Sequence, residues 1–363
     1  MKRLYFLFAT LLFAGIFNVL NATEPDFTAG GIHYLITSGE DPLEVSVTYE
    51  TEDVPTVTYT GNMVIPATVT FEGKKYAVTG ISEHAFYDCK TLKSITLPAT
   101  LEIISKYAFF NCEGLTAIIV PNSVKEIGYN AFGECNSLKT VTLSSTLEKI
   151  GDNAFEYCPG LTSITLPASL KEIKNDIFYQ CKNLLSIKVG AGSQSFSSVD
   201  GVLFNKSLSA LIRYPAAKPN LTFIVPKSVT RIENYAFNGC SKLTEITLSD
   251  TLQSLGDNVL FHVFENCNAL TKIIAGSNNR NFLSDEGVLF NKEKTILIQY
   301  PAGKKDNSYS VPAGVRVIGG SAFNSIRYLK NLTLPESVNE IGAFSFGTTF
   351  DRFVVLAKKP PRV

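Results

Sequence analysis

The residues of this sequence that could carry out redox or metal chemistry are seven cysteines and three histidines. The cysteines are regularly spaced: each one follows a phenylalanine by three residues. They are Cys89, Cys112, Cys135, Cys158, Cys181, Cys240 and Cys267. If the copies stack as coils, equivalent side chains lie about 4.8 Å apart and parallel, whereas a disulfide needs Cβ atoms about 3.8 Å apart on converging bonds. We therefore expect a buried column of free thiols that pack as small apolar side chains.

Two of the histidines, His84 and His262, stand immediately before an Ala-Phe or Val-Phe pair. Other copies of the same motif place Tyr107, Asn130 or Asp176 at this position. Such variety indicates a tolerant turn position rather than a zinc ligand. We expect no metal ion and no cofactor.

Catalytic motifs are absent from the sequence. It has no glycine-rich phosphate loop, HExxH, GxSxG or EF-hand pattern. Acidic residues are spread singly over predicted turns, as in Lys125-Glu126 and Glu148-Lys149. We expect no catalytic residues and no enzyme activity. A paired-carboxylate glycosidase site, built from residues of different coils, is the alternative that the sequence leaves open.

A repeat of 23 residues must position all these side chains. The segment Ala154–Ile173, AFEYCPGLTSITLPASLKEI, is a representative copy. Its phenylalanine recurs at a constant spacing, at Phe86, Phe109, Phe132, Phe155 and Phe178. After each cysteine a leucine follows three residues on, and an aliphatic residue three further on. A fixed period of this size, with leucines at fixed offsets, predicts a leucine-rich repeat solenoid.

Each copy predicts two short strands and little helix. Ser163–Leu166 alternates polar and apolar residues, as a half-buried strand does, and Pro167 ends it because proline has no N–H for a ladder. Leu170–Ile173 is a second extended piece, and Ala154–Cys158 is long enough for only one helical or 3₁₀ turn. One copy cannot fold alone, so copies must bury one another's faces. We expect a right-handed β-rich solenoid that curves into an arc.

Residues 1–22 are typical of a secretory signal peptide, with Lys2-Arg3, an apolar run and a small residue, Ala22, at the end. Its removal leaves 31 basic and 33 acidic residues, a net charge of about −2. This balance argues against nucleic acid or an anionic membrane as a bulk partner. We expect an exported protein, at the cell surface or outer envelope or secreted, with no membrane span after cleavage.

Three further segments follow. Residues 23–80 lack the repeat and hold short alternating runs between turns, which predicts a small N-terminal β cap. Residues 81–356 predict a solenoid of about 11 coils. Two of these are long, at about 196–218 and 282–304, and share a Gly-Val-Leu-Phe-Asn-Lys unit that predicts a hairpin turning at Asn-Lys. Residues 357–363 form a tail whose charge and proline blunt an exposed strand edge.

The outer surface of the predicted strands is the candidate ligand-binding face. One residue per coil, in the strand that precedes the Leu-Pro or equivalent pair, points away from the core. These residues are Thr96, Ile119, Thr142, Thr165, Lys188, Thr247, Ile274 and Thr333. They predict a mildly polar face suited to a large partner, although threonine also simply suits strands. The alternatives are an aromatic patch of Tyr87, Phe110 and Tyr179, and the two hairpins near Asn205 and Asn291.

The pattern AFxxCxxLxxIxLPxxLxxI is similar to the BspA-like, or Treponema pallidum-type, leucine-rich repeats of bacterial surface proteins. The similarity covers Gly80 to about Leu356. The hairpin unit DGVLFNK…LIRYP and the segment TYTGNMVIPATVTFEGKKYAVTGI also resemble Bacteroides-type members. The resemblance implies an exported or surface-displayed protein, and some relatives act as adhesins toward host matrix proteins or other bacteria. It defines no ligand residue.

Together these observations predict a non-enzymatic, adhesin-like binding protein that is a monomer. Its expected ligand is a host extracellular protein or a bacterial surface protein, recognised through the solenoid surface. A glycan-binding accessory protein of a polysaccharide-handling system, or an envelope scaffold, are the alternatives. Aromatic residues along one groove would favour the glycan, and a bare terminal coil would favour the scaffold.

Overall fold

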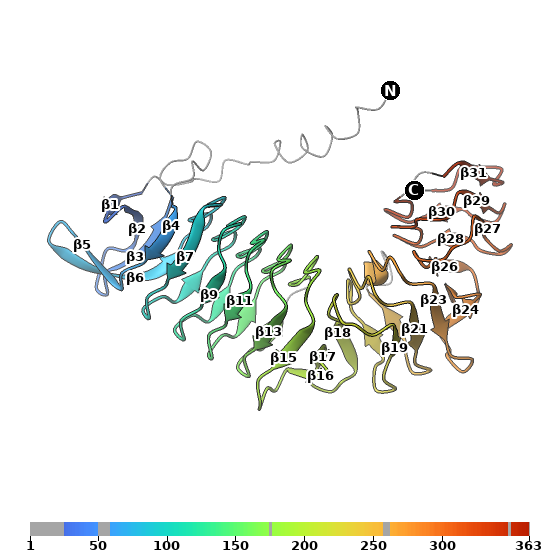
Figure 1. Cartoon of the computed structure of the whole chain (residues 1–363), viewed down its shortest axis with the longest axis horizontal. Helices are drawn as coiled ribbons and strands as arrows, with labels where there is room; N and C mark the ends of the chain where they lie inside the picture. The colour runs from blue at the N-terminus through green and yellow to red at the C-terminus, as the bar shows by residue number, and fades with distance from the viewer. Residues whose placement is uncertain (1–24, 50–58, 174–175, 257–261, 348–349, 363) are drawn as a thin grey trace, which may run out of the picture.

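The computed structural model describes residues 25–49, 59–173, 176–256, 262–347 and 350–362. Within them the chain forms a β-solenoid with almost no helix, as predicted, and it has about 12 turns where the sequence predicted about 11. The coils stack along a curved axis, so the molecule is an arc whose two ends rise on the same side (Figure 1). The predicted signal peptide lies outside the described residues. No helix in the described part of the chain is long and apolar enough to span a membrane.

Each coil contributes one strand to a surface that we call the threonine face. Its strands alternate buried and outward-pointing residues, and each pairs in parallel with the strand of at least one neighbouring coil. They are β4 (Gly61–Val64), β7 (Leu92–Thr96), β9 (Ala117–Ile119), β11 (Thr140–Thr142), β13 (Ser163–Leu166), β15 (Ser186–Val189), β19 (Thr222–Ile224), β21 (Glu245–Leu248), β23 (Lys272–Ala275), β27 (Ser308–Ser310), β29 (Asn331–Leu334) and β31 (Arg352–Val355).

A second set of strands, mostly two residues long, forms the opposite face. Its parallel ladders join Ile104 to Ile127 and Ile127 to Ile150, one repeat apart. The strands are β6 (Lys74–Ile81), β8 (Ile103–Ile104), β10 (Glu126–Ile127), β12 (Lys149–Ile150), β14 (Glu172–Ile173), β18 (Ala210–Arg213), β20 (Arg231–Ile232), β22 (Ser254–Leu255), β26 (Ile296–Gln299), β28 (Val317–Ile318) and β30 (Glu340–Ile341).

The N-terminal segment caps this second ladder. Strands β1 (Phe27–Ala29), β2 (Ile32–Ser38) and β3 (Glu44–Thr48) are antiparallel, and β3 then pairs in parallel with β6. β5 (Thr68–Phe71) forms a hairpin with β6, turning at Glu72-Gly73. The parallel ladders reach into the segment that the sequence assigned to the cap, because β4 pairs with β7 and β6 with β8. That segment therefore supplies both a cap and a first coil.

Two columns of equivalent side chains fill the core. The repeat phenylalanines are buried and stack with ring centroids 4.8 Å apart at Phe86–Phe109 and 5.4 Å apart at Phe132–Phe155. The seven cysteines are all free and buried, as predicted. The thiol of Cys135 donates a hydrogen bond to the carbonyl of Phe109 at 3.2 Å, in the preceding coil. The buried phenylalanine and cysteine of each coil therefore contact the coil that precedes it.

The Ala-Phe-x-x-Cys segments are tight turns, and the expected single-turn helices are mostly absent. In each turn the residue before alanine and the residue before cysteine are left-handed, as at Asn130 (φ 53°) and Glu134 (φ 57°). Two such residues four positions apart interrupt any right-handed helix. Within the described residues the one exception is the 3₁₀ helix η1 (His262–Phe264).

Each long coil contains a three-stranded antiparallel meander. In the first, β16 (Phe196–Val199) pairs with β17 (Val202–Asn205), which pairs with β18. The second repeats this order with β24 (Phe282–Asp285), β25 (Val288–Asn291) and β26. The predicted turn at Asn205 is present, because its side-chain oxygen accepts a hydrogen bond from the Ala210 N–H at 2.9 Å. The tighter turn at Asp200-Gly201 was not anticipated.

The C-terminal tail also belongs to the ladder. Arg362 pairs in parallel with Glu340, and the Ile341 N–H donates to the Arg362 carbonyl at 2.8 Å. The tail therefore covers β30 on the opposite face. On the threonine face the last strand is β31.

The phenylalanine column can be tested by truncation. Phe132→Ala should lower the free energy of unfolding by about 3–5 kcal/mol, because the ring is fully buried between Phe109 and Phe155. Urea denaturation followed by circular dichroism measures the loss. Ile119→Ala is the matched control: its side chain is 69% exposed, so the change should stay within about 0.5 kcal/mol. Equal losses in the two variants would contradict the role of the column.

The cysteine column predicts unreactive thiols. Burial raises the pKa of Cys135 to about 12 and that of Cys181 to about 11, so the nucleophilic thiolate is scarce at about pH 8. A thiol-specific chromogenic reagent should leave the native protein unlabelled and should react with all seven cysteines after denaturation. Rapid labelling of the native chain would show that the column is open to solvent.

Candidate functional site

The threonine face carries all eight residues predicted to bind a ligand, in register across neighbouring coils. Ile119 lies opposite Thr142, Thr165 opposite Lys188, and Thr247 opposite Ile274. Thr333 lies on β29 between β27 and β31. The repeat places these side chains outward because the residues on either side of each one fill the core.

The face is not continuous, however, and the eight residues do not form one site. The turn of each meander lies against the edge of a face strand: Gly201 beside Ser186 of β15, and Gly287 beside Lys272 of β23. A Cβ on Gly201 would lie 2.7 Å from the Ser186 Oγ, and the φ of 74° at this position also favours glycine. The two turns divide the face into three stretches: β4 to β15, β19 to β23, and β27 to β31.

The structure adds four residues to the predicted row. They lie opposite the predicted residues in the ladders and are Val64, Ile224, Ser310 and Val354. Sequence reasoning missed them because their coils lack the Ala-Phe-x-x-Cys motif. The signal that could have found three of them is an aliphatic residue followed by proline, which comes directly after Val64, Ile224 and Ser310.

The N-terminal stretch, β4 to β15, is the longest and most exposed part of the face. All six residues of its row are exposed: Val64, Thr96, Ile119, Thr142, Thr165 and Lys188. Val64 and Ile119 are 68% and 69% exposed. Apolar and hydroxyl side chains with a single charge therefore project together from six neighbouring strands.

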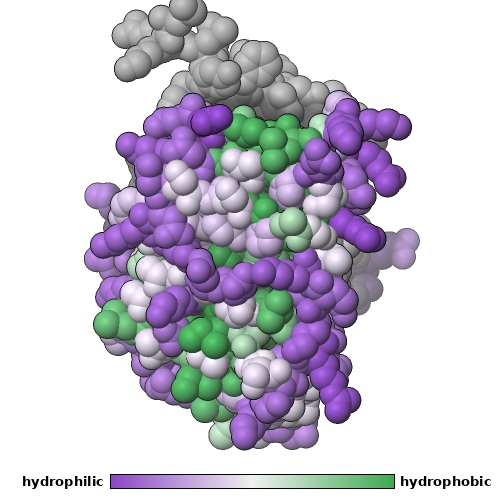
Figure 2. All heavy atoms as spheres, turned by 90° about the vertical axis from the view of Figure 1, so that its right-hand side faces the viewer, coloured by the Kyte–Doolittle hydropathy of each residue, from purple (hydrophilic) through white to green (hydrophobic). Residues whose placement is uncertain are grey.

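The C-terminal stretch, β27 to β31, is hollowed. A depression of about 480 Å³ is lined by Ser308, Tyr309, Ser310, Asn331, Thr333, Arg352, Val354 and Leu356. Figure 2 shows the side of the molecule at the right of Figure 1, where pale and apolar side chains form a band with hydrophilic side chains on both flanks. Of the eight predicted residues, only Thr333 lines this hollow.

The predicted aromatic patch exists in a different form, along the Ala-Phe turns. Tyr87 and Phe110 stack with centroids 5.1 Å apart, whereas Tyr179 belongs to a second group with Tyr157 and Tyr235. Further rings extend the first group: His84 stacks on Tyr107, whose edge meets Tyr129. We call this line of rings the aromatic edge, comprising His84, Tyr87, Tyr107, Phe110, Tyr129, Tyr157, Tyr179 and Tyr235.

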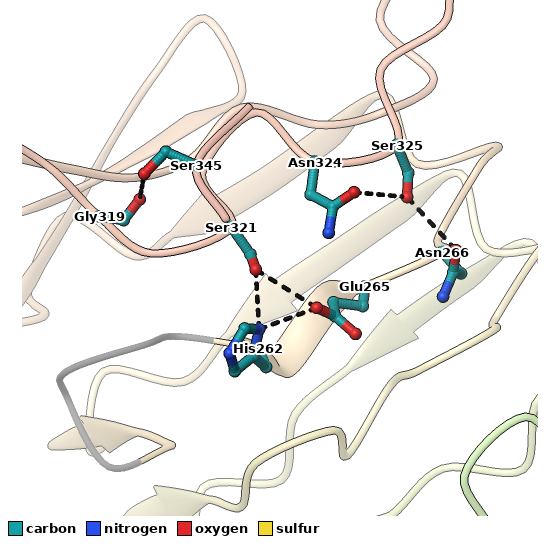
Figure 3. Close-up of polar contacts among 8 residues, drawn as sticks. All are labelled: His262, Glu265, Asn266, Gly319, Ser321, Asn324, Ser325 and Ser345. Atoms are coloured by element: carbon teal, nitrogen blue, oxygen red, sulfur yellow. Dashed lines mark hydrogen bonds and ion pairs between the residues drawn. The ribbon is translucent and has the colours of Figure 1, made fainter. Parts of the chain in front are cut away.

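A buried polar cluster surrounds His262 and crosses the second long coil (Figure 3). The Ser321 hydroxyl and the Glu265 carboxylate lie 2.7 and 2.8 Å from the same ring nitrogen, Nδ1 of His262. In a hydrolytic triad the serine and the carboxylate meet opposite ring nitrogens, so this arrangement does not form one. Ser325 donates to Asn266 at 3.3 Å in the same gap. The cluster joins turns 59 residues apart, which sequence spacing alone could not reveal.

The first long coil is bridged by a buried arginine instead. The Arg213 guanidinium donates to the carbonyls of Tyr235, Phe178 and Asn238 at 2.5, 2.8 and 3.2 Å. A cavity of about 140 Å³ beside it is also lined by Asp176, whose buried Oδ1 has no hydrogen-bond partner. Burial raises the pKa of Asp176 to about 7, although the nearby Arg213 charge acts in the opposite direction.

Neither cluster provides ligands for a metal ion. In the part of the chain that the structure describes, no three His, Cys, Asp or Glu side chains lie close enough together to hold one. The groups that the threonine face and the aromatic edge present are apolar side chains, hydroxyls and aromatic rings.

Comparison with known proteins identifies the family of this repeat. A family model described as the BspA type leucine rich repeat region matches six copies, over residues 77–209, 217–295 and 302–351. No curated protein matches the chain.

Three solved structures share the fold over 92% of this chain. The pneumococcal vaccine antigen PcpA aligns with a TM-score of 0.65 and 24% identity over 86% of its own chain. A leucine rich cell surface protein from Faecalibacterium prausnitzii aligns with a TM-score of 0.58 and 25% identity over 95% of its chain. A leucine-rich repeat protein from Eubacterium ventriosum has a TM-score of 0.50 and 19% identity, also over 95% of its chain.

The buried carboxyl group of Asp176 predicts a pH-dependent stability. Its pKa of about 7 in the folded state exceeds the ordinary 3.8, so folding takes up a proton between these values and stability falls as the pH rises through them. Asp176→Asn should remove this loss and be more stable than the parent chain by about 2–4 kcal/mol at about pH 8. Asparagine also tolerates the left-handed φ of 62° at this position.

Urea denaturation of both chains over this pH range measures the effect. The difference in stability should shrink toward zero at about pH 4, where Asp176 is protonated when folded. A difference that is the same at every pH would contradict an ionising carboxyl group in this cavity.

Proposed function

Because this chain belongs to the BspA-type leucine-rich repeat family of bacterial surface proteins, we propose that it is a non-enzymatic, adhesin-like binding protein. It acts at the cell surface or after secretion, following removal of residues 1–22. Its ligand is a protein, of the host matrix or of another bacterium, held on the threonine face from β4 to β15. The similar Faecalibacterium prausnitzii protein is a cell surface protein, which supports this location.

The observation that carries the proposal is the row of six exposed side chains from Val64 to Lys188, which no meander turn divides. Backbone pairing joins its strands two by two, as β4–β7, β9–β11 and β13–β15. Six strands at about 4.8 Å spacing give a surface about 24 Å long, a span suited to another protein rather than to a small molecule. The exposed β-branched side chains of Val64 and Ile119, which are separated in the row by Thr96, would lose water on contact with a partner. Charged residues are depleted at the centre of protein interfaces, and Lys188 is the one charge in this row.

The aromatic edge is the observation that favours the glycan-binding alternative, since sugar rings pack on aromatic faces. Tyr157 and Tyr129 are 42% and 39% exposed. The rings of Tyr87 and Phe110, however, cover each other at an interplanar angle of 17°, which leaves less open ring face for a sugar. We therefore rank a protein ligand first.

The scaffold alternative is favoured by the exposed terminal strand β31. It does not compete for the same surface, because β31 and the N-terminal stretch lie in opposite limbs of the arc (Figure 1). A chain can bind a ligand on one limb and assemble through the other.

A binding experiment with purified residues 23–363 on arrays of matrix proteins and glycans tests the proposal. We expect saturable binding to a protein, and a loss of at least about tenfold in Thr142→Arg and Thr165→Arg, because a long charged side chain prevents close contact. Ile103→Arg is the matched control, since Ile103 is 47% exposed on the opposite face. Binding that survives both face variants, or that requires the aromatic edge and a sugar, would overturn the proposal.

A further inference from the structure

The last strand of the threonine face, β31, has a free edge. Among the described residues it pairs with β29 alone, and its N–H groups at Arg352 and Leu356 donate to the carbonyls of Lys330 and Leu334 at 3.1 and 3.0 Å. Because alternate residues of a parallel strand bond to the same neighbour, Phe353 and Val355 direct their N–H and C=O groups away from β29. Two donors and two acceptors therefore line this edge.

In two other strands of the threonine face, the backbone N–H and C=O groups at the position equivalent to Phe353 do have hydrogen-bond partners. These partners show what kind of group this position binds. Ile187 of β15 corresponds to Phe353, and its N–H donates to the Gly201 carbonyl at 2.9 Å while its carbonyl accepts from the Ser198 hydroxyl at 2.5 Å. Ile273 of β23 makes the equivalent bonds, to Gly287 at 2.9 Å and from Ser284 at 2.5 Å. In both cases the partner is a meander strand and its turn. Among the described residues, nothing equivalent lies beside Phe353.

Two side chains of β31, like its outer backbone groups, are exposed to solvent at this edge. Phe353 and Val355 pair with Leu332 and Leu334, which are core residues with 0% exposure. Phe353 and Val355 are nevertheless 45% and 38% exposed. Two core positions of the solenoid thus remain open to solvent at this edge, and a further strand would bury them.

The charge around the edge selects among partners. The charged residues of 350–361 are Asp351, Arg352, Lys358 and Lys359, and Lys358 lies 4.0 Å from Glu336, whereas Arg362 lies beside β30 on the opposite face. Arg352 also lines the hollow beside β31. A basic rim favours an acidic partner and disfavours a second copy of the same edge, which would bring like charges together.

We propose that the edge of β31 is a docking site for an extended, acidic segment of a partner protein, which adds to the threonine face as one more strand. Its backbone bonds to Phe353 and Val355, its apolar side chains cover these two residues, and its acidic side chains lie beside Arg352. Backbone bonds supply affinity in such strand addition, and alternate side chains supply specificity. This site is separate from the row between Val64 and Lys188.

A synthetic peptide of alternating aspartate and valine is the probe. Fluorescence anisotropy with the purified chain should show saturable binding that weakens as salt is raised. Val355→Pro should weaken it at least about tenfold, because proline removes one outward N–H and is tolerated at a sheet edge. Val355→Ala, which keeps that N–H, should bind more tightly than Val355→Pro.

Arg352→Glu tests the charge with every backbone group retained. It should weaken the aspartate peptide at least about tenfold and improve binding of a lysine-valine peptide. Circular dichroism checks that the variants fold, and Thr142→Arg should leave peptide binding unchanged, which separates this site from the proposed ligand face. Three results would overturn the proposal: no saturable binding, equal binding in Val355→Pro and the parent chain, or a dimer in sedimentation experiments that Val355→Pro abolishes.

Discussion

Hydrogen bonding between successive coils is the interaction on which the rest of the structure depends. A single coil of 23 residues has two very short strands and too little apolar surface to fold alone. Stacking gives each strand a neighbour in register and buries the phenylalanine and cysteine of one coil against the next, as where the Cys135 thiol reaches the Phe109 carbonyl. Every other feature is either a repetition of this contact or a means of preserving it where the repeat changes.

The two long coils show how the contact is preserved. Tyr214 and Tyr300 replace the repeat phenylalanine and stack on Phe237 and Phe323. The turns on either side then face each other across a gap, and buried polar groups fill it: Arg213 in the first and the His262 cluster in the second. Histidine, serine and glutamate in contact therefore serve packing here. Their geometry, with two partners at one ring nitrogen, indicates this more clearly than their residue types.

The same contact explains where the molecule can interact. Stacking turns one outward residue per coil into a row, and the meander turns limit that row to three stretches. It also leaves a strand without a neighbour wherever stacking stops. On the opposite face, β1, β2 and β3 extend the ladder beyond β6 and the tail pairs with β30. On the threonine face, β4 pairs only with β7 among the described residues, and β31 keeps its outer backbone groups and two half-exposed core positions. The stacking of coils therefore produces the row of outward residues and also leaves the edge of β31 unpaired among the described residues.

The sequence alone determined what depends on local periodicity. Its 23-residue spacing was sufficient to predict the solenoid, the buried free cysteines and the outward row from Thr96 to Thr333, because side-chain direction in a strand follows directly from position in the repeat. The turn at Asn205 was also predictable, since its side chain forms a hydrogen bond with the nearby backbone. Only the tertiary structure decided the contacts between residues far apart in the chain. It split the row where Gly201 and Gly287 approach the face, joined His262 to Ser321 across 59 residues, and left Phe353 exposed at a core position. These outcomes depend on which coil lies next to which, and no local pattern encodes that.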